Sequence, residues 1–209
     1  MHIAIAGNIG AGKTTLTRML CSYYGWQPRF EAVIDNPYLE DYYSDIPRWS
    51  FCLETYFLKQ RFKDVLDINR MSNVETLVQD RTIYEGVHVF VRYNYEHGNL
   101  SERDYRTYMD LFDLMTSLTR MPDLMIYLRK SLPILIKQIQ LRGRAYEQTM
   151  QLEYLQGLNE IYDDFIFNKY QGRVLIIESD ELDFEHNPQD FQKITNKIDA
   201  ELFGLFSNQ

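Results

Sequence analysis

The sequence lacks long apolar runs, has only two cysteines and carries no excess of basic residues. No run approaches membrane-spanning length and residues 1–6 are too short for a signal sequence, so we expect no membrane partner. Cys21 and Cys52 lie far apart without metal-ligand spacing, which favours reduced thiols in a cytoplasmic protein. A net charge of -8 argues against a nucleic-acid polymer as partner, because binding its backbone requires a basic surface. Repeats, low-complexity tracts and long linkers are absent too, so residues 1–209 predict a single domain.

What the sequence does contain is a phosphate-loop pattern, G-x-x-x-x-G-K-[ST], between the apolar run 2–6 and a segment of helical periodicity. Its glycines let backbone N–H groups turn toward phosphate oxygens, and the following helix adds its N-terminal positive dipole. We expect Lys13 to reach the β- and γ-phosphates of a nucleoside triphosphate and the Thr14 hydroxyl to bind Mg²⁺. The predicted nucleotide contacts of the loop are Gly7, Asn8, Ile9, Gly10, Ala11, Gly12, Lys13, Thr14 and Thr15.

Short apolar runs alternate with helical patterns along the chain. The predicted strands are 2–6, about 29–34, 75–80, 123–129 and 173–177. The helical patterns include 47–69, 101–119, 131–142, 150–168 and 187–206. This alternation predicts an α/β protein of the P-loop NTPase fold, with a five-stranded parallel sheet and helices on both faces. Ligands then bind at the carboxyl ends of the strands.

Three charged residues lie at predicted strand ends. Glu31 follows the second strand, where a carboxylate can take a proton from an acceptor hydroxyl, although an ordinary surface glutamate fits this position equally well. Asp80 ends the third strand and can hold Mg²⁺, while Arg81 beside it can orient Glu31 and the acceptor. A structural ion pair at a helix start is the alternative for Asp80 and Arg81. The triphosphate expected at Lys13 favours the functional interpretation, with Glu31, Arg81 and Lys13 as catalytic residues.

A basic turn, Arg142-Gly143-Arg144, follows the predicted helix 131–142. The glycine between two arginines indicates a mobile turn that can close over phosphates, stabilise transition-state charge and exclude water. A solvated basic turn is the alternative, which we would prefer without the phosphate loop. We therefore predict an arginine-bearing lid.

The helix 47–69 is apolar on more than one side, and Glu54 projects beside one of its apolar stripes. A carboxylate that is partly buried there requires a partner. That partner is either an arginine or a ligand with paired N–H donors.

Taken in order, these pieces resemble the deoxynucleoside kinases, and the bacterial members most closely, over nearly the whole chain. The matching motifs beyond the phosphate loop are Glu31, Asn36-Pro37-Tyr38-Leu39-Glu40, Arg48-Trp49-Ser50-Phe51, Asp80-Arg81-Thr82-Ile83-Tyr84-Glu85, Arg142-Gly143-Arg144 and Asp180-Glu181-Leu182-Asp183-Phe184.

The resemblance implies that Glu31 is the base for the sugar 5′-hydroxyl and that Asp80 and Arg81 belong to the D/E-R-S motif, with threonine replacing serine. It implies further that Tyr43 and Glu147 bind the 3′-hydroxyl, and that Phe90 stacks on the nucleobase, although core packing explains Phe90 as readily. The lid and the donor-base segment would contact the phosphate donor through Arg142, Arg144, Asp183 and Phe184.

Three positions depart from the family pattern. Glu54 stands where many relatives carry a glutamine; an ionised carboxylate offers only acceptors, which match the N1–H and N2–H donors of guanine. Gly86 stands where relatives often carry an aspartate near the base, which leaves room for a purine. Gln138 replaces a further arginine and puts the full set of phosphate contacts in doubt.

We therefore expect an enzyme that moves the γ-phosphoryl group of ATP, or of another nucleoside triphosphate, to the 5′-hydroxyl of a purine deoxynucleoside, with deoxyguanosine favoured over deoxyadenosine. The alternatives are a deoxyadenosine/deoxycytidine kinase of the same family, a thymidylate-type monophosphate kinase and a non-catalytic nucleotide-binding switch. A monophosphate kinase should carry a cation where this chain has Glu31, and a GTP switch should carry an Asn-Lys-x-Asp segment, which is absent. The resemblance also suggests a homodimer.

Overall fold

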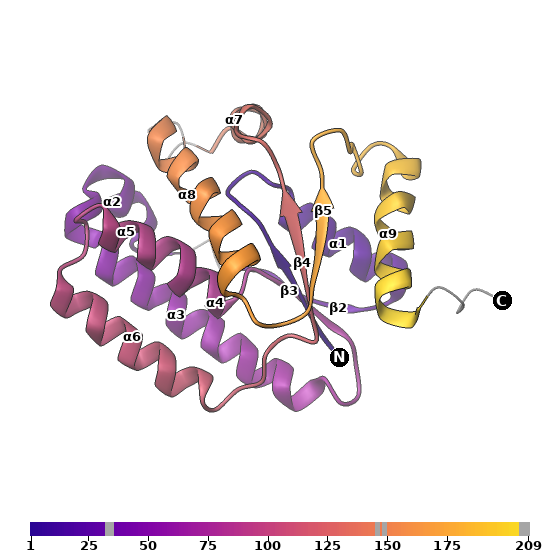
Figure 1. Ribbon diagram of the computed structural model, residues 1–209, viewed down its shortest axis with the longest axis horizontal. Helices are drawn as coiled ribbons and strands as arrows, with labels where there is room; N and C mark the ends of the chain where they lie inside the picture. Colours follow the sequence, from indigo (N-terminus) through magenta and orange to yellow (C-terminus); the bar gives the residue numbers. More distant parts are fainter. Residues whose placement is uncertain (32–35, 145–146, 148–149, 205–209) are drawn as a thin grey trace.

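The computed structural model describes residues 1–31, 36–144, 147 and 150–204. Its centre is a sheet whose neighbouring strands all run parallel, in the order β2-β3-β1-β4-β5 (Figure 1). The strands are β1 (His2–Ala6), β2 (Gln27–Arg29), β3 (Leu77–Asp80), β4 (Leu124–Arg129) and β5 (Val174–Glu178). The chain passes from β3 on one side of β1 to β4 on the other. Ligands of such sheets bind at the carboxyl ends of the strands beside this reversal, which here is the loop after β1.

Helices cover both faces of the sheet, as predicted (Figure 1). They are α1 (Lys13–Tyr24), α2 (Leu39–Ser44), α3 (Ile46–Met71), α4 (Ile83–Glu85), the π-helix η1 (Gly86–Val91), α5 (Arg92–Glu96), α6 (Glu102–Thr116), α7 (Leu132–Arg142), α8 (Leu152–Asp164), the π-helix η3 (Phe165–Lys169) and α9 (Pro188–Phe203). None of the helices in this described part of the chain is both long and apolar enough to cross a bilayer.

The alternation of side chains along β1 separates two cores. Ile3 and Ile5 pack in one core with α1 and α9, whereas Ala4 and Ala6 pack in the other with α8. The alanines leave space for large aromatic side chains on their face of the sheet. Those rings are Phe90, Tyr93, Tyr127, Tyr154, Tyr162 and Phe165.

The long helix α3 has a clear start signal. The Asp45 carboxylate accepts a hydrogen bond of 3.2 Å from the backbone N–H of Arg48, and Pro47 occupies the first turn. Residues two turns apart on such a helix share a face, which places Glu54 and Arg61 on the same side.

The second strand is shorter than the sequence predicts. Instead of spanning about 29–34, β2 ends at Arg29, so Glu31 lies beyond the strand; residues 32–35 lie outside the described part of the chain. The reason is that β2 is an edge strand that pairs only with β3, over Gln27 to Arg29. Pro28 is tolerated at such an edge because a proline has no N–H for a second neighbour.

Candidate active site

The loop after β1 has a backbone that only glycine adopts easily. Gly10 and Gly12 have φ angles of 84° and 96°. A Cβ atom at Gly12 would lie 3.0 Å from Cζ of Phe184. Lys13 begins α1, and its Nζ donates a hydrogen bond of 3.0 Å to the backbone oxygen of Asn8, across the loop. The predicted strand, loop and helix are thus present, and the N-terminus of α1 faces the loop.

The side chain of Asn8 is used inside the protein. Its Nδ2 donates to the Leu155 carbonyl and to Oδ1 of Asn159, both at 3.1 Å. The loop is therefore fixed to α8, and the amide group of Asn8 is not free to bind a nucleotide.

Glu85 is a buried glutamate that binds the start of this loop at Gly7. The sequence alone assigned it no role of its own. Its Oε1 accepts from the backbone N–H of Gly7 at 3.3 Å and from the Tyr162 hydroxyl at 2.9 Å. Its Oε2 accepts from the N–H of Thr82, whose hydroxyl in turn accepts from the Glu85 N–H, which makes a capping box for α4. The T-x-x-E spacing is the sequence signal that identifies this residue.

Thr14, in the first turn of α1, contacts Asp80, the last residue of β3. The Thr14 hydroxyl donates a 2.5 Å hydrogen bond to Oδ2 of Asp80. The other oxygen, Oδ1, is buried and has no hydrogen-bond partner among the described residues. Burial raises the pKa of the Asp80 carboxyl, and nearby Lys13 opposes that shift. A buried carboxylate oxygen without a donor, beside a hydroxyl and a phosphate loop, fits a hard cation such as Mg²⁺.

Two arginines hold Glu31. Oε1 of Glu31 pairs with Nη2 of Arg61, and Oε2 lies 3.2 Å from Nε of Arg81. Burial alone would raise the pKa of the Glu31 carboxyl, but the charges of Arg81 and Arg61 outweigh it and lower that pKa. Glu31 is therefore an ionised acceptor in a fixed orientation at neutral pH.

Arg81 has an unusual backbone for a residue with a side chain. Its φ angle is 68°, in the left-handed region, which costs of the order of 1 kcal/mol or more. Its N–H donates to the Ile5 carbonyl at 3.1 Å, and its guanidinium lies 4.4 Å from the centre of the Phe90 ring. With this backbone conformation the Arg81 side chain reaches Glu31, so the strained residue is one that positions the candidate base.

These groups line one cavity of about 340 Å³, and most of the predicted site residues lie on it. Of the predicted residues, those on its wall are Ile9, Gly10, Lys13, Thr14, Glu31, Tyr43, Glu54, Asp80, Arg81, Phe90, Arg142, Arg144 and Glu147. Those not among its lining residues are Gly7, Asn8, Ala11, Gly12, Thr15, Gly86, Asp183 and Phe184. The wall also includes residues that the sequence analysis missed, chiefly Phe30, Tyr42, Leu53, Phe57, Arg61 and Tyr154. A cavity with a phosphate loop at one end and Glu54 in its lining has room for both a phosphate group and a ring.

Comparison with known proteins identifies the family. The family model of the deoxynucleoside kinases matches residues 3–203. The chain belongs to the deoxynucleoside kinase family. A deoxyadenosine/deoxycytidine kinase of Bacillus subtilis is 35% identical, and the match covers 94% of this chain and 90% of that protein. A deoxyguanosine kinase of the same organism is 34% identical, over 94% and 95%. The structure of deoxyadenosine kinase from M. mycoides with bound dATP superposes with a TM-score of 0.81 at 32% identity, covering 95% of this chain and 99% of that one.

The comparisons confirm the resemblance and the enzyme class: this protein is an ATP-dependent deoxynucleoside kinase. Its relatives are named as deoxyadenosine, deoxyguanosine and deoxycytidine kinases, so membership of the family does not identify the nucleobase of the substrate.

At Gly86 this kinase differs from what we expected. A Cβ atom there would lie 2.7 Å from Nη1 of Arg61, so the space that glycine leaves is filled by a guanidinium rather than left for a purine. The physical reason is that Arg61 must reach Glu31 across the start of η1. Gly86 therefore acts on the site through Arg61.

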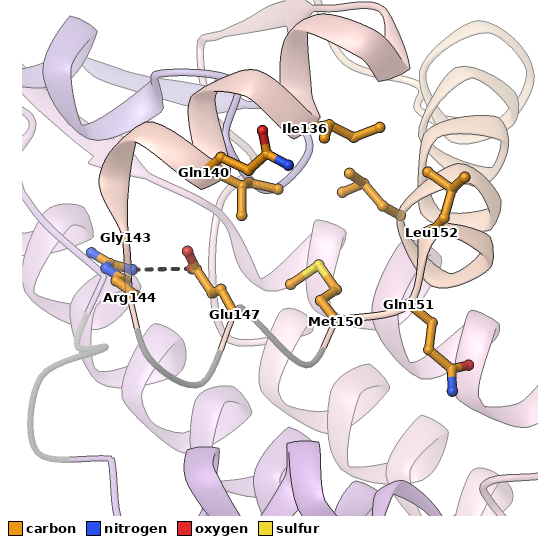
Figure 2. Close-up of a pocket in the computed structure, with 10 residues that line it drawn as sticks. Ile136, Gln140, Gly143, Arg144, Glu147, Met150, Gln151 and Leu152 are labelled. Carbon is orange, nitrogen blue, oxygen red and sulfur yellow. Dashed lines mark ion pairs between the residues drawn. The ribbon is translucent and has the colours of Figure 1, made fainter.

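The two arginines of the predicted lid, Arg142 and Arg144, pair with Glu147. Arg142 donates from Nη2 to Oε1 of Glu147 at 2.5 Å and from Nε to Oε2 at 3.1 Å, and Nη1 of Arg144 lies 3.7 Å from Oε1. Figure 2 shows the Arg144–Glu147 pair beside a second, largely apolar cavity of about 490 Å³ at α7 and α8. Gly143 between the arginines ends α7 with a φ angle of 66°. That these arginines close over phosphates stays a prediction.

The predicted donor-base segment of the kinase lies against the phosphate loop, but its aromatic residue is covered. The Phe184 ring is 5% exposed and packs on Gly12, in the core with α1 and α9. The Asp183 side chain is exposed, and its Oδ1 accepts from Nδ1 of His186 at 2.9 Å. Contact with a donor base through this segment stays a prediction. The contact that the Phe184 ring makes in the structure is with Gly12 of the phosphate loop.

Proposed function

We propose that this kinase transfers the γ-phosphoryl group of ATP, or of another nucleoside triphosphate, to the 5′-hydroxyl of a purine deoxynucleoside, with deoxyguanosine favoured over deoxyadenosine. One observation carries the proposal: the ionised Glu31, oriented by Arg61 and Arg81, lines the same cavity as Lys13 and Asp80. Phosphoryl transfer needs the acceptor oxygen positioned in line and positive charge around the group that moves. Glu31 supplies an acceptor for the hydroxyl proton, and Arg81 and Lys13 supply charge.

The same geometry disfavours an acceptor that already carries a phosphate. A carboxylate at the acceptor position repels a phosphate group and accepts a hydroxyl proton. A thymidylate-type substrate therefore fits this cavity less well than a nucleoside.

Thr14 and Asp80 are the residues that would hold Mg²⁺, which would neutralise charge on the donor phosphates. Tyr43 and Glu147 line the cavity where the 3′-hydroxyl would bind, and Phe90 lines it beside Arg81. Purine preference rests on Glu54, whose carboxylate matches the N1–H and N2–H donors of guanine.

The direct test is phosphorylation of all four deoxynucleosides side by side, with ATP and Mg²⁺, at about pH 8. Thymidine monophosphate, a reaction without acceptor and a reaction with EDTA serve as controls. We expect deoxyguanosine first, deoxyadenosine second and no turnover with EDTA. Turnover of the monophosphate alone, or triphosphate hydrolysis that needs no acceptor, would exclude the proposal.

Glu147 offers a second prediction, because it pairs with the lid arginines and lines the nucleoside cavity. Glu147→Gln should raise the KM for the deoxynucleoside about tenfold, since a hydrogen bond to a charged group contributes about 1.5 kcal/mol. It should also raise ATP hydrolysis without nucleoside, because Arg142 and Arg144 lose the charged partner that competes with the donor phosphates for them. Steady-state kinetics of both reactions measure this, with exposed Glu153→Gln as the matched control. An unchanged KM would remove Glu147 from the sugar site.

We also propose that the kinase forms a homodimer and works in the cytoplasm. Leu114 on α6 and Leu118 just after it are more than 60% exposed, at 62% and 64%, which supports an interface there. Both cysteines are free, which suits a reducing compartment. Sedimentation of the purified protein at several concentrations tests the dimer, and a monomer at micromolar concentration would exclude it.

A further inference from the structure

Glu54 is a buried carboxylate whose setting does more than present two acceptors. It is 3% exposed and lies on α3, where it lines the nucleoside cavity together with the apolar side chains of Leu53 and Phe57. Among the described residues its Oε2 has no hydrogen-bond partner, whereas Oε1 accepts from Nδ2 of Asn94 at 3.3 Å.

The amide of Asn94 is oriented by its own neighbours. Its Oδ1 accepts from the Tyr42 hydroxyl and from Nδ2 of Asn99, both at 3.2 Å. Because that oxygen is occupied by donors, Asn94 presents its NH₂ group to Glu54. Oε1 of Glu54 is therefore an acceptor in every protonation state, and a proton on this carboxyl sits on Oε2.

The charged and titratable groups around Glu54 lie on four helices and in the loops after β2 and β3, and they do not fix it as an anion. Arg61 on α3 and Arg81 after β3 favour the ionised form, but both are paired with Glu31, whose negative charge favours the neutral form. The phenols that face it from α2, α6 and α8 have pKa values raised by burial and stay neutral; they are Tyr42, Tyr108 and Tyr154. Burial of the carboxyl itself is the largest effect and raises the pKa of Glu54 to about 7.

The two protonation states of Glu54 recognise different bases. Ionised, its oxygens accept from N1–H and N2–H of guanine. Protonated, Oε2 donates to the N1 lone pair of adenine while Oε1 accepts from the exocyclic amine, and the N3 and N4 edge of cytosine offers the same pair.

We propose that Glu54 is a proton-dependent selector of the nucleobase, which binds guanine when ionised and adenine when protonated. This inference rests on the proposed nucleoside kinase function and specifies its substrate. It makes the ranking of deoxyguanosine and deoxyadenosine a property of pH rather than a constant.

The test is the ratio of kcat/KM for deoxyguanosine to that for deoxyadenosine, measured from about pH 6 to about pH 8, where neither free base titrates. Both reactions share Glu31, Lys13 and the donor, so their pH effects cancel in the ratio. If each form of Glu54 binds one base, the ratio rises about tenfold per pH unit, or about a hundredfold over the range.

Glu54→Gln is the decisive variant, because glutamine keeps the shape and the bond from Asn94 but does not titrate. Its ratio should be independent of pH and should favour deoxyadenosine. Glu75→Gln, the same change at an exposed position, should keep the slope of the unaltered enzyme.

Binding calorimetry gives a second readout that does not depend on turnover. In buffers of different ionisation enthalpy at about pH 7, where Glu54 is about half protonated, deoxyadenosine binding should take up about half a proton and deoxyguanosine binding should release about half a proton, and Glu54→Gln should show neither. A flat ratio with both nucleosides still phosphorylated would overturn the selector and leave the kinase proposal intact. Absence of phosphorylation at every pH would instead overturn the proposed function, and the selector with it.

Discussion

Glu31→Gln is expected to lower kcat by about 10²- to 10⁴-fold, the range lost when a positioned general base is removed. Glutamine has the same shape and can still accept the hydrogen bond from Arg61, but it cannot accept the proton of the 5′-hydroxyl. The affinity for ATP should change little, because the phosphate loop and Lys13 do not depend on Glu31 for their geometry. Steady-state kinetics and nucleotide binding measure the two parts separately.

The same change should also lower the melting temperature. Glu31 pairs with Arg61 and Arg81, which are 4% and 6% exposed, so its loss leaves two buried cations without their partner. Breaking a buried pair costs about 3 to 5 kcal/mol when one partner is removed. Glu160→Gln on the exposed side of α8 is the control, and it should leave both turnover and melting unaltered. Normal turnover in Glu31→Gln would exclude this carboxylate as the base.

The sequence predicts the framework of the site because the signals for it are local. The phosphate loop depends on glycines at fixed spacing, and Gly10 and Gly12 have the positive φ angles that explain their presence. Asp80 closes an apolar strand, and the parallel sheet brings the end of that strand beside the loop after β1. Such features follow from motif and periodicity alone.

Arg61 was missed because its role depends on contacts far apart in the chain. It pairs with Glu31 and fills the space beside Gly86, and both of these residues lie more than twenty positions away from Arg61 in the sequence. The available signal was its place two helical turns after Glu54, on the same face of α3. Periodicity indicates that the two share a side, but not that Arg61 points to Glu31.

The segment from Ile83 to Glu96 shows a conflict between pattern and fold. Valines at alternate positions of 87–91 are typical of a strand, and the sequence analysis assigned no element there. In the structure this segment is α4, η1 and α5, packed between α3, α6 and α8. Tertiary packing overrides the intrinsic preference of β-branched residues.

Lys13→Met is expected to reduce phosphoryl transfer by about 10³-fold or more, because one preorganised cation at the transferring group contributes several kcal/mol. Unlike Glu31→Gln, it should leave the melting temperature equal or higher. Lys13 is 7% exposed, and its Nζ donates to the Asn8 carbonyl and forms no ion pair within the described residues. Removing a buried cation that lacks such a partner relieves its desolvation.

The titration of Lys13 gives this prediction an independent check. Burial, together with the charge of Arg81, lowers the pKa of Lys13 to about 8. Bound phosphates favour the charged ammonium, so above about pH 8 ATP binding by the unaltered enzyme should take up a proton, and ATP affinity should fall as the pH rises further. Calorimetry in two buffers at about pH 9 measures the proton. Lys197→Met, an exposed change on α9, should keep both the uptake and the turnover, whereas Lys13→Met should lose them. Full turnover in Lys13→Met would mean that another cation contacts the phosphates.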